Sequence, residues 1–163
     1  AFADNAVAGI LIIDKAVEDG KTDMYGKQND EVRLSYERQL FDLANVARAL
    51  NGLKPYKWDD AVANVARQHS RDMAENGYFD HVSPAGKSLS DRLDVGGVDF
   101  AAAAENIAAG QPNAITAHHS WMNSATGHRE NILGDLDFLG VGVYFGGEHR
   151  VYYTQNFYTP ASR

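Results

Sequence analysis

A chain of 163 residues has the usual length of one domain, and its 44% hydrophobic and 23% charged residues are typical of a folded, water-soluble protein rather than a disordered or fibrous one. The net charge of −7 repels phosphate, which argues against nucleic acid as a partner. The chain has no cysteine, which excludes disulfides and thiolate chemistry, and no apolar run approaches the roughly 20 residues of a transmembrane segment.

Residues 1–30 mix a short apolar stretch with a polar tract and lack sustained periodicity, so we interpret them as an N-terminal extension. The chain begins with Ala1 rather than methionine, as expected of a secreted protein whose leader has been removed, although a trimmed fragment would begin in the same way. A helix is predicted over residues 31–50, with Asn51-Gly52 as its stop. Its apolar residues recur every three or four positions, at Leu40, Leu43, Ala44, Ala47 and Leu50.

A second helix is predicted to begin after a cap at Asp59 or Asp60 and to end at Gly77, which suits a left-handed C-terminal cap. One face of this helix carries Val62, Val65, Ala66, His69 and Met73.

Residues 78–87 are typical of a loop, and residues 88–93 can form a short helix that ends at the following glycine pair. Residues 101–109 leave two interpretations open. Four consecutive alanines favour a helix, whereas the neighbouring Gly110 and Pro112 allow only a short element.

Asn113 is a suitable N-cap for a further helix from Ala114 to about Ser124, with its end near Gly127. The predicted helix would place four residues on one side: Ile115, His118, Trp121 and Met122. Alternating residues over 139–145 and 151–157, joined by Gly146-Gly147, then predict a β-hairpin. Helices first and strands late indicate an α+β fold in which helices cover a largely antiparallel sheet.

Three residues are candidates for a functional site. His81 lies in the loop after the second helix and could act as a metal ligand or a general base, or be an ordinary surface histidine. Glu105 lies among apolar alanines, where a carboxylate requires a cationic or hydrogen-bonding partner, which either a salt bridge or a catalytic role would provide. His128 follows the helix that carries Trp121, and its simplest interpretation is a histidine that contacts the carbonyls at that helix end.

Other polar residues have simpler interpretations. We expect His69 to be a hydrogen-bonded core residue, His118 to be packed, and His119 and His149 to face solvent. Ser83 and Ser124 are candidate hydroxyls, although surface loops explain both. Two histidines and a glutamate are a common zinc ligand set, but His81, Glu105 and His128 lie too far apart in the sequence to match a local metal motif.

The chain resembles the bacterial branch of the CAP superfamily, which is named for cysteine-rich secretory proteins, antigen 5 and plant pathogenesis-related proteins. The resemblance extends from about Tyr36 to Phe157. Its motifs are Asn45-Val46-Ala47-Arg48, Trp58-Asp59, His69-Ser70-Arg71-Asp72-Met73, the loop from Tyr78 to Pro84, Glu105-Asn106-Ile107-Ala108, Trp121-Met122-Asn123-Ser124, Gly127-His128-Arg129-Glu130-Asn131-Ile132-Leu133, Gly140-Val141-Gly142-Val143 and Tyr153-Thr154-Gln155-Asn156-Phe157.

The resemblance implies a three-layer α-β-α sandwich over residues 31–163, an extracellular or cell-surface location, and a cleft where two histidines and two acidic residues converge. By position, the histidines are His81 and His128, and the first acid is Glu105. The second acid of eukaryotic members would fall at Ser124, where this chain has no carboxylate. Between Ser124 and His128 the chain also has one residue more than the usual bacterial spacing.

Three functions follow as alternatives. The first is a secreted binding module in which His81 and His128 hold zinc or another divalent cation and Glu105 orients them, with a lipid, a peptide or a cell-wall component as ligand. The second is an extracellular hydrolase, peptidase-like or cell-wall-directed, that uses Glu105 as general base together with His81 and His128. The third is a structural role in which Glu105 bridges the two loops through imidazolium hydrogen bonds.

Overall fold

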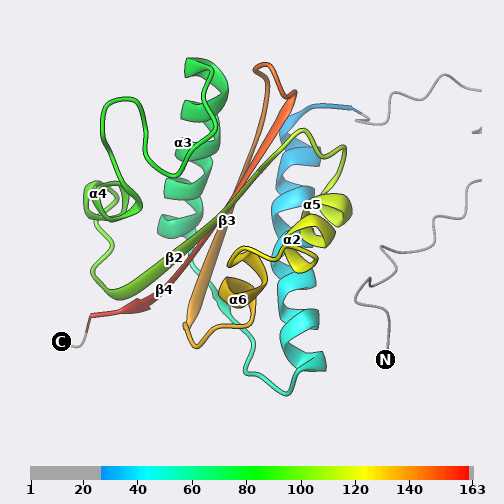
Figure 1. The fold of residues 1–163 in the computed structure, drawn as a ribbon, viewed down its shortest axis with the longest axis vertical. Helices are drawn as coiled ribbons and strands as arrows, with labels where there is room; N and C mark the ends of the chain where they lie inside the picture. The colour runs from blue at the N-terminus through cyan, green and yellow to red at the C-terminus, as the bar shows by residue number, and fades with distance from the viewer. Residues whose placement is uncertain (1–26, 162–163) are drawn as a thin grey trace, which may run out of the picture.

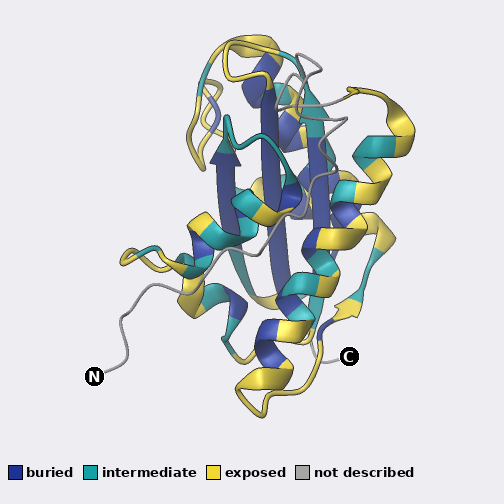
Figure 2. Ribbon diagram, turned by 90° about the vertical axis from the view of Figure 1, so that its right-hand side faces the viewer, coloured by how far each residue is buried: buried dark blue, intermediate teal, exposed yellow. Residues whose placement is uncertain are grey.

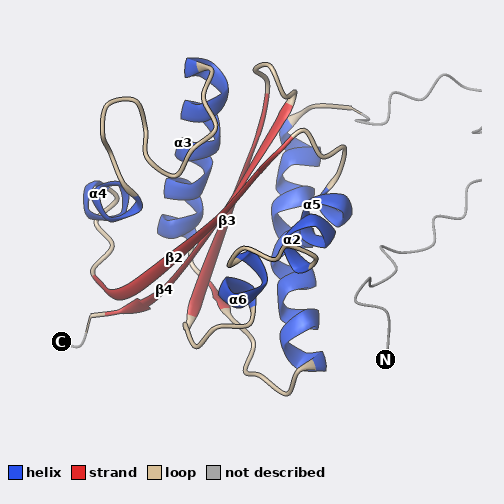
Figure 3. Ribbon diagram, viewed as in Figure 1, coloured by secondary structure: helices blue, strands red, loops and turns tan. Residues whose placement is uncertain are grey.

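The computed structural model describes residues 27–161, and most of the predicted N-terminal extension, residues 1–26, lies outside the described residues. One sheet lies between two layers of helices, with α3 and α4 on one side and α2, α5 and α6 on the other (Figures 1 and 3). The helices are α2 (Asp30–Leu50), α3 (Asp60–Asn76), α4 (Leu89–Val95), α5 (Ala114–Met122) and α6 (His128–Ile132). The strands are β1 (Lys57–Trp58), β2 (Phe100–Ala109), β3 (Phe138–Phe145) and β4 (Val151–Pro160). This arrangement confirms the predicted three-layer α-β-α sandwich.

The sheet has the strand order β1-β3-β4-β2. Strands β3 and β4 form the predicted antiparallel hairpin, and β2 pairs antiparallel with the other side of β4. Only β1 is parallel to its neighbour, pairing Lys57 and Trp58 with Phe138 and Leu139. The sheet is therefore largely antiparallel, as predicted, with β2 at one edge.

The helix limits follow the capping residues that the sequence indicates. Asn29 and Asp59 accept hydrogen bonds from the first turns of α2 and α3, and α3 ends at Gly77, whose φ of 66° lies in the left-handed region. Asn113 caps α5 in the same way. Figure 2 shows the consequence, since the strands are buried and the outer faces of the helices are exposed. None of the described helices is long and apolar enough to cross a membrane.

Residues 101–109, for which the sequence left helix and strand open, lie in strand β2. Alanine has a high helix propensity, but β2 pairs with β4 along almost its whole length. Its small side chains lie beside the largest residues of β4, with Ala103 opposite Tyr158, Ala104 opposite Phe157 and Ala108 opposite Tyr153. Tertiary pairing therefore overrides local propensity here.

The four residues expected on one side of α5 differ in how far they are buried. This helix buries Ala114, Ala117 and Trp121, while Ile115 is 48% exposed. The helix also ends at Met122 rather than near Ser124, and a separate short helix, α6, follows it. Trp121 donates its indole N–H to the carbonyl of Ile107, which fixes α5 against β2.

Candidate functional site

Glu105 on β2 has the partners that a carboxylate among apolar residues requires. Its side chain is 3% exposed, and each oxygen accepts one strong hydrogen bond. Oε1 lies 2.8 Å from Nδ1 of His81, and Oε2 lies 2.6 Å from Nη2 of Arg92. Burial of this charge is therefore compensated by a guanidinium and an imidazole.

His81 lies in the loop between α3 and α4 and is about half exposed, at 51% of its side chain. The hydrogen bond to Glu105 raises the pKa of its imidazole, against the opposing effect of partial burial. Arg92 of α4 also donates to the backbone carbonyls of His81 and Lys87, at 2.8 and 3.2 Å. Arg92 thus holds both the loop and the carboxylate to which His81 is bound.

His128 is the first residue of α6, so its expected place at the end of the helix that carries Trp121 is wrong. Its Nδ1 lies 2.8 Å from Oγ of Ser124, not against helix-terminal carbonyls. Desolvation lowers the pKa of His128, and the charge of His81 lowers it further. A positive charge on His81 therefore disfavours protonation of His128.

Two asparagines connect α6 to the strand that carries Glu105. Asn131 donates from Nδ2 to the carbonyl of Glu105 at 3.2 Å and to Oδ1 of Asn106 at 2.9 Å. Asn106 in turn donates to the carbonyl of His128 at 3.0 Å. Because these bonds join fully or partly buried groups, they fix the start of α6 against the part of β2 that carries Glu105.

Arg92, Asn106 and Asn131 were not among the predicted site residues. No local sequence pattern points to Arg92 as a site residue. It lies 13 residues from Glu105, in a short helix whose sequence is typical of a surface element. The two asparagines lie within segments of the family pattern, Asn106 directly after Glu105 and Asn131 three residues after His128, and could have been recognised there as buried amides. The sequence alone does not show that these segments lie together in space.

The remaining candidates differ in outcome. His69 is fully buried, as predicted, and its Nε2 lies 3.7 Å from Oε1 of Glu105. Ser83 is buried rather than at the surface, and its Oγ accepts from the backbone N–H of Lys87. His149 is exposed, as expected.

The adjacent histidines of α5, His118 and His119, lie in different environments. His118 is largely packed, as predicted, with Nδ1 fully buried. His119, expected to face solvent, is only partly exposed, and its ring lies within 3.0 Å of Nδ2 of Asn123. Neighbours on a helix point in different directions, so this pair cannot clamp one ion.

Over the described range 27–161, no three or more histidine, aspartate or glutamate side chains come together in a way that could hold a metal ion. His81 and His128 each have Nδ1 occupied by an oxygen and no described hydrogen-bond partner at Nε2. Glu105 has both oxygens engaged.

Buried histidines predict a loss of stability in mild acid. Desolvation lowers the pKa of both His69 and His118 from 6.5 to about 4, and for His69 the charge of Glu105 opposes this shift in part. Between these two values the unfolded chain binds more protons than the folded chain, so the unfolding free energy falls as the pH decreases from about 6.5 toward 4. His81 acts in the opposite sense, because its raised pKa contributes stability that is lost as the pH rises through that pKa.

We expect His118→Gln to reduce the difference in unfolding free energy between pH 7 and pH 5, measured by urea denaturation. The reason is that glutamine takes up no proton in either state. The prediction would be contradicted if the unfolding free energy fell by the same amount from pH 7 to pH 5 in the variant and in the unmodified protein.

Comparison with known proteins places this geometry within a family pattern. A family model described as the Cysteine-rich secretory protein family, CAP, matches residues 41–157, which include His81, Glu105 and His128. The uncharacterized membrane protein YlbC of Bacillus subtilis is 45% identical over 150 residues, covering 91% of this chain and 40% of that protein.

Two solved structures are similar as well. An extracellular protein containing an SCP domain, from Bacillus anthracis, has a TM-score of 0.75 at 40% identity, covering 82% of this chain and 45% of that one. A cysteine-rich secretory protein from Staphylococcus aureus has a TM-score of 0.68 at 27% identity, covering 82% and 41%. The chain therefore spans less than half the length of each of these relatives.

Proposed function

Because the chain belongs to the cysteine-rich secretory protein family, CAP, we propose that it is an extracellular binding module whose ligand-contacting residues are His81, Glu105 and His128. The relatives support the location, since one is an extracellular protein of Bacillus anthracis and another a secretory protein of Staphylococcus aureus. The ligand class we propose is an extracellular lipid, peptide or cell-wall component.

The orientation of the two imidazoles is the observation that carries the proposal. In both rings Nδ1 lies 2.8 Å from an oxygen, which is Oε1 of Glu105 for His81 and Oγ of Ser124 for His128. A neutral ring that donates from Nδ1 has its lone pair on Nε2. Metal-binding histidines show this arrangement, in which the second nitrogen donates to an oxygen that fixes the ring.

Zinc or another divalent cation fits these two nitrogens, because zinc prefers imidazole among the ligands this chain contains. When bound, it would supply a Lewis acid that attracts an oxygen of the ligand. Glu105 would orient His81 and offset part of the ion's charge, and Ser124 would orient His128. The serine thus takes over the orienting contact at the position where eukaryotic members have their second acid.

The contacts of Glu105 disfavour the alternative function, an extracellular hydrolase. A general base takes a proton from water, and protonation of Glu105 would remove the negative charge to which Arg92 and His81 are bound. Ser124 provides no second carboxylate. We therefore propose affinity without turnover, with Glu105 as an orienting group that also holds the His81 loop against α4.

The test is a calorimetric zinc titration at pH 7 of protein purified without chelator or metal-affinity resin. We expect saturable uptake, and we expect the double variant His81→Ala, His128→Ala to abolish it. Absence of uptake in the unmodified protein, or unchanged uptake in the double variant, would overturn the metal site and favour a purely structural role for Glu105.

Matched variants separate the site from general effects. His149→Ala removes an exposed histidine outside the site and should leave the uptake unchanged. Ser124→Ala should weaken zinc binding about tenfold, because His128 loses its orienting partner. Ser120→Ala, which removes a neighbouring exposed hydroxyl on α5, should have no such effect.

A further inference from the structure

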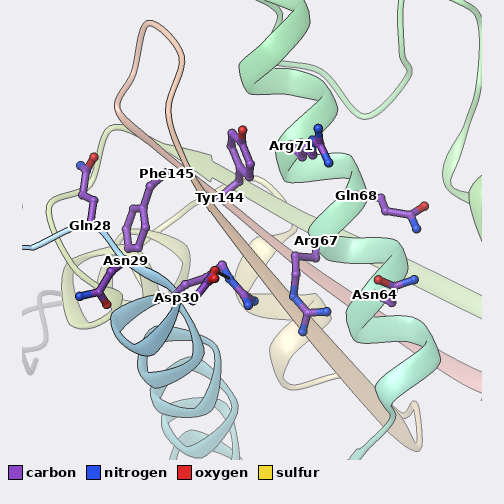
Figure 4. A pocket seen from close by; sticks show the side chains of 10 residues that line it. Gln28, Asn29, Asp30, Asn64, Arg67, Gln68, Arg71, Tyr144 and Phe145 are labelled. Atoms are coloured by element: carbon purple, nitrogen blue, oxygen red, sulfur yellow. Dashed lines mark hydrogen bonds and ion pairs between the residues drawn. The ribbon is translucent and has the colours of Figure 1, made fainter.

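A hollow lies where the beginning of α2, one face of α3 and the end of β3 meet (Figure 4). It is at the edge of the sheet opposite to Glu105. Its volume is about 690 Å³, within the range of about 300–1,000 Å³ that is typical of small-molecule sites. Helix α3 contributes Asn64, Arg67, Gln68 and Arg71, which the helical period places on one face.

A buried carboxylate, Glu37, contacts two of the arginines that line the hollow. Strand β1 pairs only with Phe138 and Leu139, so within residues 27–161 no strand pairs with the rest of the outer edge of β3. The backbone N–H of Val143 donates instead to Oε1 of Glu37, at 3.2 Å. Glu37 is 1% exposed, and its position on α2 allows it to take the place of a neighbouring strand.

Two guanidiniums that line the hollow are hydrogen-bonded to Glu37. Arg67 donates from Nε and Nη2 to the two oxygens of Glu37, both at 2.9 Å, and Arg33 donates from Nη1 to Oε1 at 2.9 Å. Arg33 also contacts Asp30 at 3.2 Å. Each arginine still has a terminal nitrogen without a partner among the described residues, so fixed donors remain available to a ligand.

The charges of the hollow are balanced. Arg71 is paired with Glu75 at 2.8 Å, so each of the three guanidiniums lies beside a carboxylate. Between these pairs, the carboxamides of Gln28, Asn64 and Gln68 form no hydrogen bond within the described part of the chain, although they line the hollow. The lining therefore combines free donors and acceptors with little net charge.

Two aromatic rings complete the lining. Tyr144 donates its hydroxyl to Glu75 at 3.0 Å, and Phe145 packs edge-on against Tyr36 with ring centroids 5.8 Å apart. These contacts hold the rings in place beside the polar side chains (Figure 4).

We infer that this hollow binds a short uncharged oligosaccharide. Carboxamides donate and accept at once, as sugar hydroxyls do, and a ligand with many hydroxyls satisfies groups that would be costly to cover with an apolar one. The rings of Tyr144 and Phe145 offer apolar surface to the C–H face of a sugar. The balanced charges argue against an anion, and the engaged N–H of Val143 argues against a peptide that adds as a strand.

The test is a titration of ¹⁵N-labelled protein with three neutral probes, cellotriose, maltotriose and N-acetylchitotriose, and with inorganic phosphate and a trimer of galacturonic acid. We expect at least one neutral trisaccharide to shift the side-chain amide signals of Asn64 and Gln68 in a saturable way. The double variant Asn64→Ala, Gln68→Ala should weaken that binding at least tenfold.

A matched double variant, Gln39→Ala, Asn76→Ala, removes exposed carboxamides elsewhere on α2 and α3 and should bind like the unmodified protein. The variant His81→Ala, His128→Ala should also bind the sugar unchanged, which separates this site from the proposed metal site. Three results would overturn the inference: no neutral trisaccharide bound at millimolar concentration, binding unaffected by the Asn64 and Gln68 substitutions, or binding of phosphate or galacturonate alone.

Discussion

Replacing Glu37 by glutamine is expected to lower the free energy of unfolding by about 3 kcal/mol, because breaking a buried ion pair leaves uncompensated charge inside the protein. Glutamine keeps the size of the side chain and removes only its charge. Arg33 and Arg67 would then lack their common partner, and the N–H of Val143 would have a weaker acceptor. Urea denaturation at pH 7, followed by circular dichroism, measures the change.

Glu75→Gln is the matched control. Glu75 is also paired with an arginine, but its side chain is 45% exposed, and exposed ion pairs contribute little. We expect this substitution to change the unfolding free energy far less than the Glu37 substitution does. Equal effects of the two substitutions would show that burial of Glu37 does not determine its contribution.

Gly142→Ala is expected to lower the free energy of unfolding by about 3 kcal/mol, through overpacking between β3 and α3. A Cβ atom at Gly142 would lie 2.0 Å from the backbone nitrogen of Arg67 and 2.3 Å from the carbonyl carbon of Ala66. Backbone atoms of a packed helix cannot rotate away as a side-chain end can, so α3 would have to move from the sheet. Thermal and urea denaturation would both detect this loss.

Gly86→Ala provides the comparison for this substitution. The space around Gly86 is open, but its φ of +78° is left-handed, so alanine there should cost only about 1 kcal/mol. A loss at Gly142 no greater than the loss at Gly86 would argue against the close approach of α3 and β3.

Those parts of the fold that have a local cause could be predicted from the sequence. The caps at Asp59 and Asn113 and the alternation in the C-terminal hairpin depend on near neighbours, and these elements were found with limits close to those observed. Strand β2 has no such cause, since its alanines become a strand only through pairing with the aromatic residues of β4. Helix α6 has five residues, too few to show a period.

The members of the candidate site were easier to predict than their contacts. An isolated carboxylate among alanines requires a partner, and Glu105 has two, His81 and Arg92. The identity of the second partner, Arg92, depends on how α4 folds back over β2, which no spacing in the sequence reveals. Whether His81 and His128 act together on a ligand stays a prediction.

The short length of β1 has a consequence for how copies of this protein behave toward one another. A strand edge with free N–H groups is a template on which a second chain can add, and such addition leads to aggregation. Among the described strands none pairs with β3 at Val143, and Glu37, by accepting from the N–H of Val143, protects the outer edge of β3 at this point. Loss of this carboxylate would therefore remove a barrier to self-association as well as a source of stability.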